Sequence, residues 1–112
     1  MSFDIVLLKP VNLNASDLAD IEEVTEVGPS AAVLALLEQV FPGCTQEVFT
    51  KGESFSVESS LAGDPVTSIH MTLRFGSAWS ESDHDDFFAP LSNLCKVLEL
   101  QAYAMTDNSR IA

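Results

Sequence analysis

Apolar and polar positions alternate in several short stretches of the chain, and this two-residue period predicts β-strands. The clearest stretch is residues 66–75, where four apolar residues share one face and four polar residues the other: Ile69, Met71, Leu73 and Phe75 against Ser68, His70, Thr72 and Arg74. Phe55 and Val57 repeat the pattern in residues 54–59, and a turn at 62–65 joins the two strands into a hairpin. One face of this hairpin is expected to be buried and the other exposed to solvent.

Three further strands are expected. Residues 3–8 are apolar on both faces, which favours a central place in the sheet. Residues 47–50 form a weaker candidate strand just before the hairpin. Residues 100–106 can form a last strand, with Gln101, Tyr103 and Met105 opposite Ala102 and Ala104. Residues 107–110 are typical of a turn or tail.

Apolar residues at helical spacing predict two helices. The first covers residues 31–41 behind the opening Gly28-Pro29-Ser30, and Pro42-Gly43 ends it. The second covers residues 83–98, with Phe87, Leu91, Leu94, Cys95 and Leu98 as its buried stripe. Because proline cannot donate a backbone hydrogen bond, Pro90 predicts that the regular helix starts near residues 86–89.

Residues 11–27 are harder to assign. Leu18, Ile21 and Val24 recur every three residues, which suits a short helix or a 3₁₀ segment, and five acids without a base lie from Asp17 to Glu26. Ser16 as an N-cap and acids in the first turn are compatible with one helical turn. We predict an acidic connector that contains about one turn of helix.

The elements follow the order β-α-β-β-β-α-β, and leaving out the weak strand at 47–50 gives the split βαβ order of a ferredoxin-like sandwich. The 112 residues, 46% of them hydrophobic, predict one α+β domain over residues 1–112. We expect a mainly antiparallel sheet of four or five strands with two helices on one face.

The chain carries 17 acidic and five basic residues, a formal net charge of −12. A nucleic-acid backbone or an anionic membrane surface would be repelled, so neither is an expected partner. The charge is uneven, because residues 1–28 hold six acids against one base while residues 88–112 balance. This negative charge either keeps the protein soluble or forms a surface that binds a basic protein.

A cytoplasmic location is expected. Residues 1–6 lack the basic and apolar regions of a secretory signal, and the longest uncharged run, residues 27–37, is too short to span a bilayer. Cys44 and Cys95 have no metal or redox spacing and are expected to be buried thiols.

Residues 79–86 combine Trp79 and His84 with several acids, and His70 lies in the strand before them. Their spacing matches no metal motif, and no nucleophile elbow, P-loop or dinucleotide fingerprint occurs, so we expect no metal, no cofactor and no catalytic residue. His70 is typical of a surface histidine, and a general base is the alternative. Trp79 either caps the edge of the core or anchors a partner.

The opening Met1-Ser2-Phe3-Asp4-Ile5-Val6, residues 66–76 and residues 94–98 resemble a loose group of small bacterial proteins of unassigned function. Some members of that group look like immunity proteins, which neutralise polymorphic toxins by tight binding. The resemblance implies a fold and a binding role, and it carries over no catalytic or binding residue.

Two hypotheses follow. The first is a non-enzymatic acidic module that binds a basic protein, as an immunity-type inhibitor of a basic toxin or nuclease does. Its contacts would come from two acidic groups and an aromatic anchor: Asp17, Asp20, Glu22, Glu23 and Glu26; Glu81, Asp83, Asp85 and Asp86; and Trp79. The second is a small ferredoxin-like enzyme or ligand-binding protein that works as a homodimer, with a site around His70 and Arg74.

Overall fold

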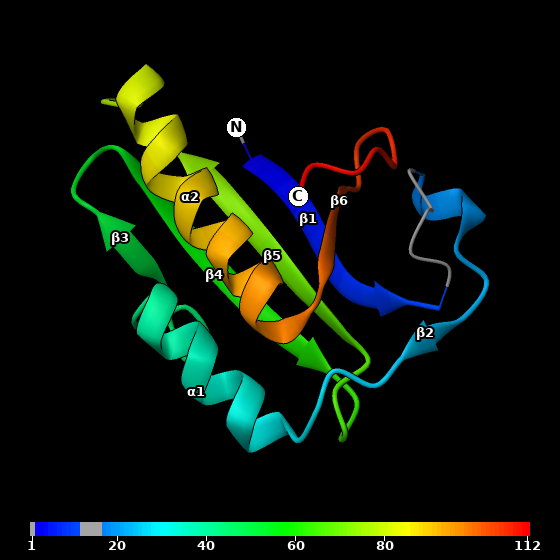
Figure 1. Ribbon diagram of the computed structural model, residues 1–112. Helices are drawn as coiled ribbons and strands as arrows, with labels where there is room; N and C mark the ends of the chain where they lie inside the picture. Colours follow the sequence, from blue (N-terminus) through cyan, green and yellow to red (C-terminus); the bar gives the residue numbers. More distant parts are fainter. Residues whose placement is uncertain (1, 12–16) are drawn as a thin grey trace.

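Strand β1 (Ser2–Pro10) runs through the middle of the sheet, as its two apolar faces predict. It pairs antiparallel with β5 (Ser68–Phe75) and with β6 (Gln101–Ala104), so that Ile5 is opposite both Met71 and Ala104 (Figure 1). Ile5 and Leu7 are fully buried there. The structure is a computed structural model and describes residues 2–11 and 17–112.

The sheet extends from β5 to β4 (Phe55–Ala62) and then to β3 (Phe49–Lys51). The very short β2 (Val24–Thr25) pairs with Lys9 and Pro10 at the end of β1. Within the described residues the sheet therefore has six antiparallel strands, whereas four or five were expected. The weak candidate at 47–50 does form β3, whereas β2 is too short to show an alternating pattern.

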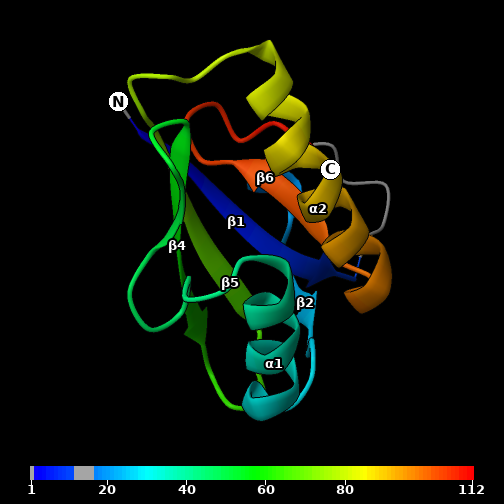
Figure 2. The ribbon, with the colours of Figure 1, turned by 90° about the vertical axis from the view of Figure 1, so that its left-hand side faces the viewer.

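Both helices, α1 (Ser30–Val40) and α2 (Glu81–Leu98), lie on the same face of the sheet (Figures 1 and 2). The predicted stripe of α2 faces inward, where Phe87, Leu91, Leu94 and Cys95 are buried and Leu98 is half-buried. The inward side of α1 buries Val33 and Leu37. The two helices cover the apolar face of the hairpin, where Ile69, Met71 and Leu73 are fully buried. The α+β class with two helices on one sheet face is confirmed.

The expected start of the second helix was wrong, because α2 begins at Glu81 and holds Pro90 in its interior. A capping box formed by Ser80 and Asp83 starts the helix before the region 86–89 that Pro90 alone would suggest. Pro90 leaves one carbonyl, that of Asp86, without its usual i+4 donor, and the capped first turns outweigh this loss.

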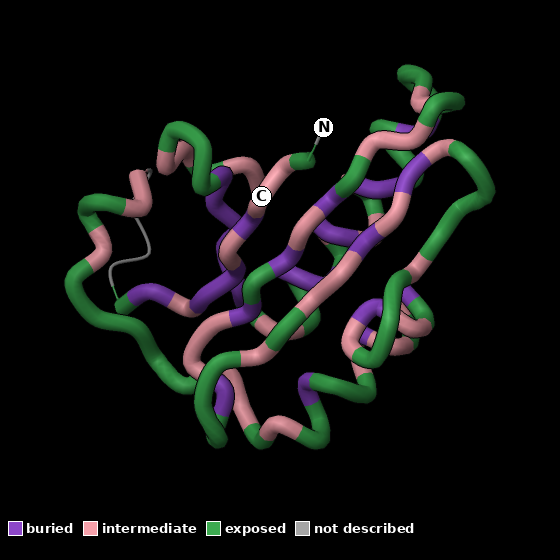
Figure 3. Tube along the Cα trace, turned by 180° about the vertical axis from the view of Figure 1, so that it is seen from behind, coloured by how far each residue is buried: buried purple, intermediate pink, exposed green. Residues whose placement is uncertain are grey.

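The opposite sheet face is half covered, as the view from behind shows (Figure 3). Tyr103 of β6, opposite Val6, has no exposed surface although it points away from the helices. Residues 108–110 and the one-turn 3₁₀ helix η1 (Leu18–Asp20) meet on this side, where the Leu18 N–H donates to the Asn108 carbonyl over 2.7 Å. The other half of the face, formed by β5 and β4, is open and polar.

The last strand is shorter than the expected 100–106, and all four of its residues are buried. The expected turn or tail at 107–110 is a turn that brings the chain back along β6. The Ala104 N–H donates to the Ser109 carbonyl, and the Ile111 N–H to the Ala102 carbonyl, each over 2.8 Å.

Candidate functional site

The acidic connector, residues 17–27, is fixed at several points. Asp17 caps η1 by accepting a hydrogen bond from the Ala19 N–H (2.8 Å), which confirms the expected single helical turn. The expected cap Ser16 lies outside the described residues. The Val11 N–H donates to the Glu23 carbonyl (3.1 Å), and the Val27 N–H to the Val66 carbonyl (2.7 Å). The connector is therefore held against the end of β1.

The acids of the connector differ in their surroundings. Asp17 is half-buried and used in capping, whereas Asp20, Glu22, Glu23 and Glu26 are exposed. None of these five acids forms an ion pair with any base in the part of the chain that the structure describes. Their negative charge is consequently directed at solvent.

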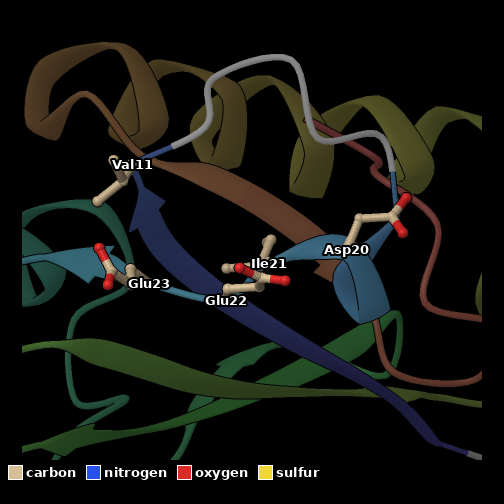
Figure 4. A pocket seen from close by; sticks show the side chains of 5 residues that line it. All are labelled: Val11, Asp20, Ile21, Glu22 and Glu23. Carbon is tan, nitrogen blue, oxygen red and sulfur yellow. The ribbon is translucent and has the colours of Figure 1, made fainter.

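A hollow of about 350 Å³ lies beside the connector (Figure 4). Three acids and two apolar residues line it: Asp20, Glu22, Glu23, Val11 and Ile21. The side chains of Glu23 and Asp20 lie toward opposite ends, with Ile21 between them (Figure 4). The hollow thus combines an apolar wall with an acidic rim.

The second acidic group, at the start of α2, is mostly used inside the protein. Asp83 is 6% exposed and accepts hydrogen bonds from Ser80, and Lys51 of β3 lies 3.9 Å from it. Lys51 also forms an ion pair with Asp86. Only Glu81 and Asp85 remain exposed without a cationic lysine or arginine partner among the described residues. This group therefore offers less free charge than the connector does.

Trp79 packs on the edge of the core. Its ring centroid lies 4.8 Å from that of Phe75 and 5.6 Å from that of Phe55, both in edge-to-face geometry. The side chain is half-buried, and its remaining surface lines an open hollow with Glu81, His84 and Asp85. Both expected roles are compatible with this position, since the ring caps core residues and keeps some exposed surface.

The two acidic groups do not form one patch. β2 of the connector pairs with Lys9 and Pro10, at the end of β1. α2 instead follows the end of β5, where Arg74 is opposite Ser2 at the beginning of β1. Figure 1 shows them on opposite sides of the molecule. A small partner that covers one group would leave the other uncovered.

The open half of the sheet carries a separate polar cluster around Thr72. Its hydroxyl donates to Asp4 Oδ1 over 2.8 Å, and His70 Nε2 lies 3.6 Å from the same oxygen. Arg74 of β5 forms an ion pair with Glu58 of the neighbouring strand β4, and this pair raises the pKa of the Arg74 guanidinium. A hollow of about 280 Å³ adjoins His70, Thr72 and Glu58. Asp4 and Glu58 were not predicted as partners, although the alternation in β4 did place Glu58 on the polar face.

Cys44 and Cys95 are free and buried, as expected. Burial raises the pKa of each thiol to about 11, so both are protonated at neutral pH. Beside Cys44, the carboxylate of Glu38 accepts hydrogen bonds from the backbone N–H groups of Gly43 and Thr45 (3.1 and 3.2 Å) and from the Thr45 hydroxyl (3.0 Å). We call this set of hydrogen bonds to Glu38 the Glu38 clasp. No sequence motif predicts it, because its residues lie around the end of α1 in no recognisable pattern.

Within residues 2–11 and 17–112, no group of three or more His, Cys, Asp or Glu side chains is arranged to hold a metal ion. None of the described helices is both long and apolar enough to cross a bilayer. No protein-family model, curated protein or solved structure matches this chain. We therefore infer function from the residues and their geometry.

Proposed function

We propose that this protein is a non-enzymatic module that binds a basic protein, in the manner of an immunity-type inhibitor of a basic toxin or nuclease. The observation that carries the proposal is the connector, where four exposed acids lie together with no base paired to them among the described residues. The resemblance to small immunity-like bacterial proteins points in the same direction. The free, buried thiols support action in a reducing compartment such as the cytoplasm.

The charge favours association with a basic surface in two ways. At long range, a net charge of −12 attracts a cationic protein and raises the rate of productive encounters. At contact, carboxylates such as Glu22 and Glu23 can pair with lysine or arginine and become partly desolvated, which strengthens each pair over the about 0.2–1 kcal/mol of a fully exposed one. The charges would thus raise the association rate and orient the partner, while apolar contacts would supply the remaining affinity.

The test is to isolate a partner and show that this protein changes what the partner does. Tagged protein would be incubated with source-cell lysate at low and then physiological salt, and retained proteins identified by mass. We expect one basic protein in an equimolar complex, and the purified partner should lose its activity when this protein is added. Its association rate constant should fall steeply as ionic strength rises. Failure to retain any basic protein at low salt would contradict the proposal.

A second candidate is a ligand site in a homodimer, formed by the polar groups on the open sheet face around His70 and Arg74. The hollow of about 280 Å³ beside His70 favours it. Against it, His70 already lies beside Asp4 and Arg74 already pairs with Glu58. A ligand that contacted either base would have to displace this internal partner. A defined dimer in solution, together with ligand binding that His70→Ala abolishes, would favour this candidate over the first.

We also propose that the domain is a ferredoxin-like sandwich. The strand order β4-β5-β1-β6 supports it, with α1 connecting β1 to β4 and α2 connecting β5 to β6. In this assignment β2 and β3 are additions at the margins of the sheet. The assignment concerns architecture alone, because this fold serves many unrelated functions.

A further inference from the structure

We infer that the basic partner docks at the connector hollow, and that it inserts a lysine or arginine side chain there. The aliphatic part of this side chain would pack on Val11 and Ile21, and its charged end would meet the carboxylates of Glu22 and Glu23. This inference rests on the proposed function and adds the place and the chemistry of the contact.

One of the two apolar residues of the hollow, Val11, is exposed, whereas Ile21 is half-buried. Val11 is 59% exposed and Val24, nearby on β2, is 39% exposed. Val11 follows directly after Pro10, which pairs with Val24, so both valines lie at the same end of β1. Exposing such side chains together favours a contact that covers them.

Backbone hydrogen bonding fixes the apolar wall relative to the acids. The Val11 N–H donates to the carbonyl of Glu23 over 3.1 Å. Val11 would contact the aliphatic part of the incoming side chain and Glu23 its charged end, so this hydrogen bond directly joins the two contacting residues. A preformed arrangement of this kind reduces the ordering cost of binding.

The charge of the hollow has no internal counterpart. None of its described lining residues is a base, and Lys9, the base nearest to it in the sequence, is paired with Glu99 over 3.0 Å. At the start of α2 the situation is different, because Lys51 already pairs with Asp83 and Asp86. An incoming cation would therefore meet unpaired carboxylates at the connector and partly compensated ones at α2.

A long cationic side chain fits this combination better than other groups do. A wholly apolar side chain would desolvate Glu22 and Glu23 without providing a counter-charge, which is costly. A small cation would leave Val11 and Ile21 uncovered. Lysine and arginine carry an aliphatic stem and a terminal charge, and they bury the first while keeping the second at a polar rim.

The experiment compares variants of equal net charge. The double variant Glu22→Gln/Glu23→Gln removes two charges at the hollow, and Glu81→Gln/Asp85→Asn removes two at the start of α2. Val11→Ser removes an apolar group from the hollow, and Val97→Ser is its control because Val97, on α2, is 58% exposed. All four variants change exposed side chains, so circular dichroism should show unchanged folding.

Binding of a synthetic octalysine peptide would be measured by calorimetry at low salt, and binding of the purified basic partner in parallel. We expect Glu22→Gln/Glu23→Gln to weaken both by about fivefold or more, and Glu81→Gln/Asp85→Asn by less than about twofold. Val11→Ser should weaken binding by about threefold, whereas Val97→Ser should have no effect.

The outcomes separate the inference from the proposed function. Equal weakening by the two charge pairs, or equal effects of Val11→Ser and Val97→Ser, would overturn the inferred site while a basic partner could still bind. If octalysine shows the expected dependence on the connector and no basic protein is ever retained, the hollow recognises lysine side chains but the proposed function is wrong.

Discussion

Ser80 and Asp83 hold the start of α2 together. The backbone N–H and the hydroxyl of Ser80 both donate to Asp83 Oδ2, over 2.9 and 3.1 Å, and Asp83 is 6% exposed. An acid that the sequence placed among candidate partner contacts therefore has a structural role that accounts for it. Its neighbour Asp85, two residues later, has a fully open side chain.

This relationship predicts different effects for two similar substitutions. Asp83→Asn removes the charged acceptor of the capping box and the neighbour of Lys51, and should lower the free energy of unfolding by about 1 kcal/mol. Asp85→Asn serves as the control and should change it by less than about 0.5 kcal/mol. Urea unfolding followed by circular dichroism measures both, and equal effects would argue against the capping role.

The apolar stripe of α1 leads to a second prediction. Leu37 is fully buried while Leu34, one turn earlier on the same helix, is 37% exposed. Leu37→Ala should cost about 2–5 kcal/mol because it leaves a cavity under the helix. Leu34→Ala should cost far less, and chemical unfolding of the two variants would show whether α1 faces the sheet as described.

The Glu38 clasp predicts an acid-sensitive contribution to stability. Hydrogen bonds from Thr45 hold the pKa of Glu38 below its ordinary value of 4.5. A lowered pKa in the folded state stabilises the protein above pH 4.5, and this stabilisation disappears as the pH falls through the folded-state value. The difference in unfolding free energy between wild type and Glu38→Gln should therefore shrink between pH 7 and pH 3.5. Glu47→Gln, an exposed position in the same loop, is the control for the loss of one negative charge.

The buried thiols give a prediction for chemical reactivity. Because the pKa of Cys44 and Cys95 is raised to about 11, little thiolate exists at pH 8. A disulfide reagent such as DTNB should react about 100-fold more slowly with the native protein than with a free thiol, and should titrate both cysteines after denaturation. Rapid modification of the native protein would contradict the burial of the thiols.

The same thiols predict weaker stability at alkaline pH. Both are neutral in the folded state up to higher pH than in the unfolded state, so their stabilising effect is complete below about pH 9 and decreases as the pH rises toward 11. Unfolding measured at pH 8 and pH 10 should show this decrease. Cys95→Ala should reduce the size of the change even though it lowers stability at both pH values.

Much of the fold could be predicted from local patterns because each pattern records which face is buried. The alternation around His70 and the helical stripe around Leu91 follow directly from the need to bury one face of each element. The start of α2 could not be read in this way, since Pro90 signals a helix break and the capping box at Ser80 and Asp83 outweighs it. The two-residue strand β2 could not be predicted either, because two residues are too few to show an alternating pattern and only its pairing with the end of β1 identifies it.

In the candidate site, too, some properties follow from the sequence and others only from the tertiary structure. The sequence by itself determined that the protein is acidic and that its connector lacks bases, and it predicts that the backbone of a nucleic acid would be repelled. The tertiary structure alone decided which acids stay free: Lys51 reaches Asp83 and Asp86 across the fold, while no described base reaches Glu22 or Glu23. It also placed Val11 beside Glu23 and separated the two acidic groups. Charge is a sum over residues and is readable from the sequence, whereas pairing and exposure depend on distances between segments that only folding brings together.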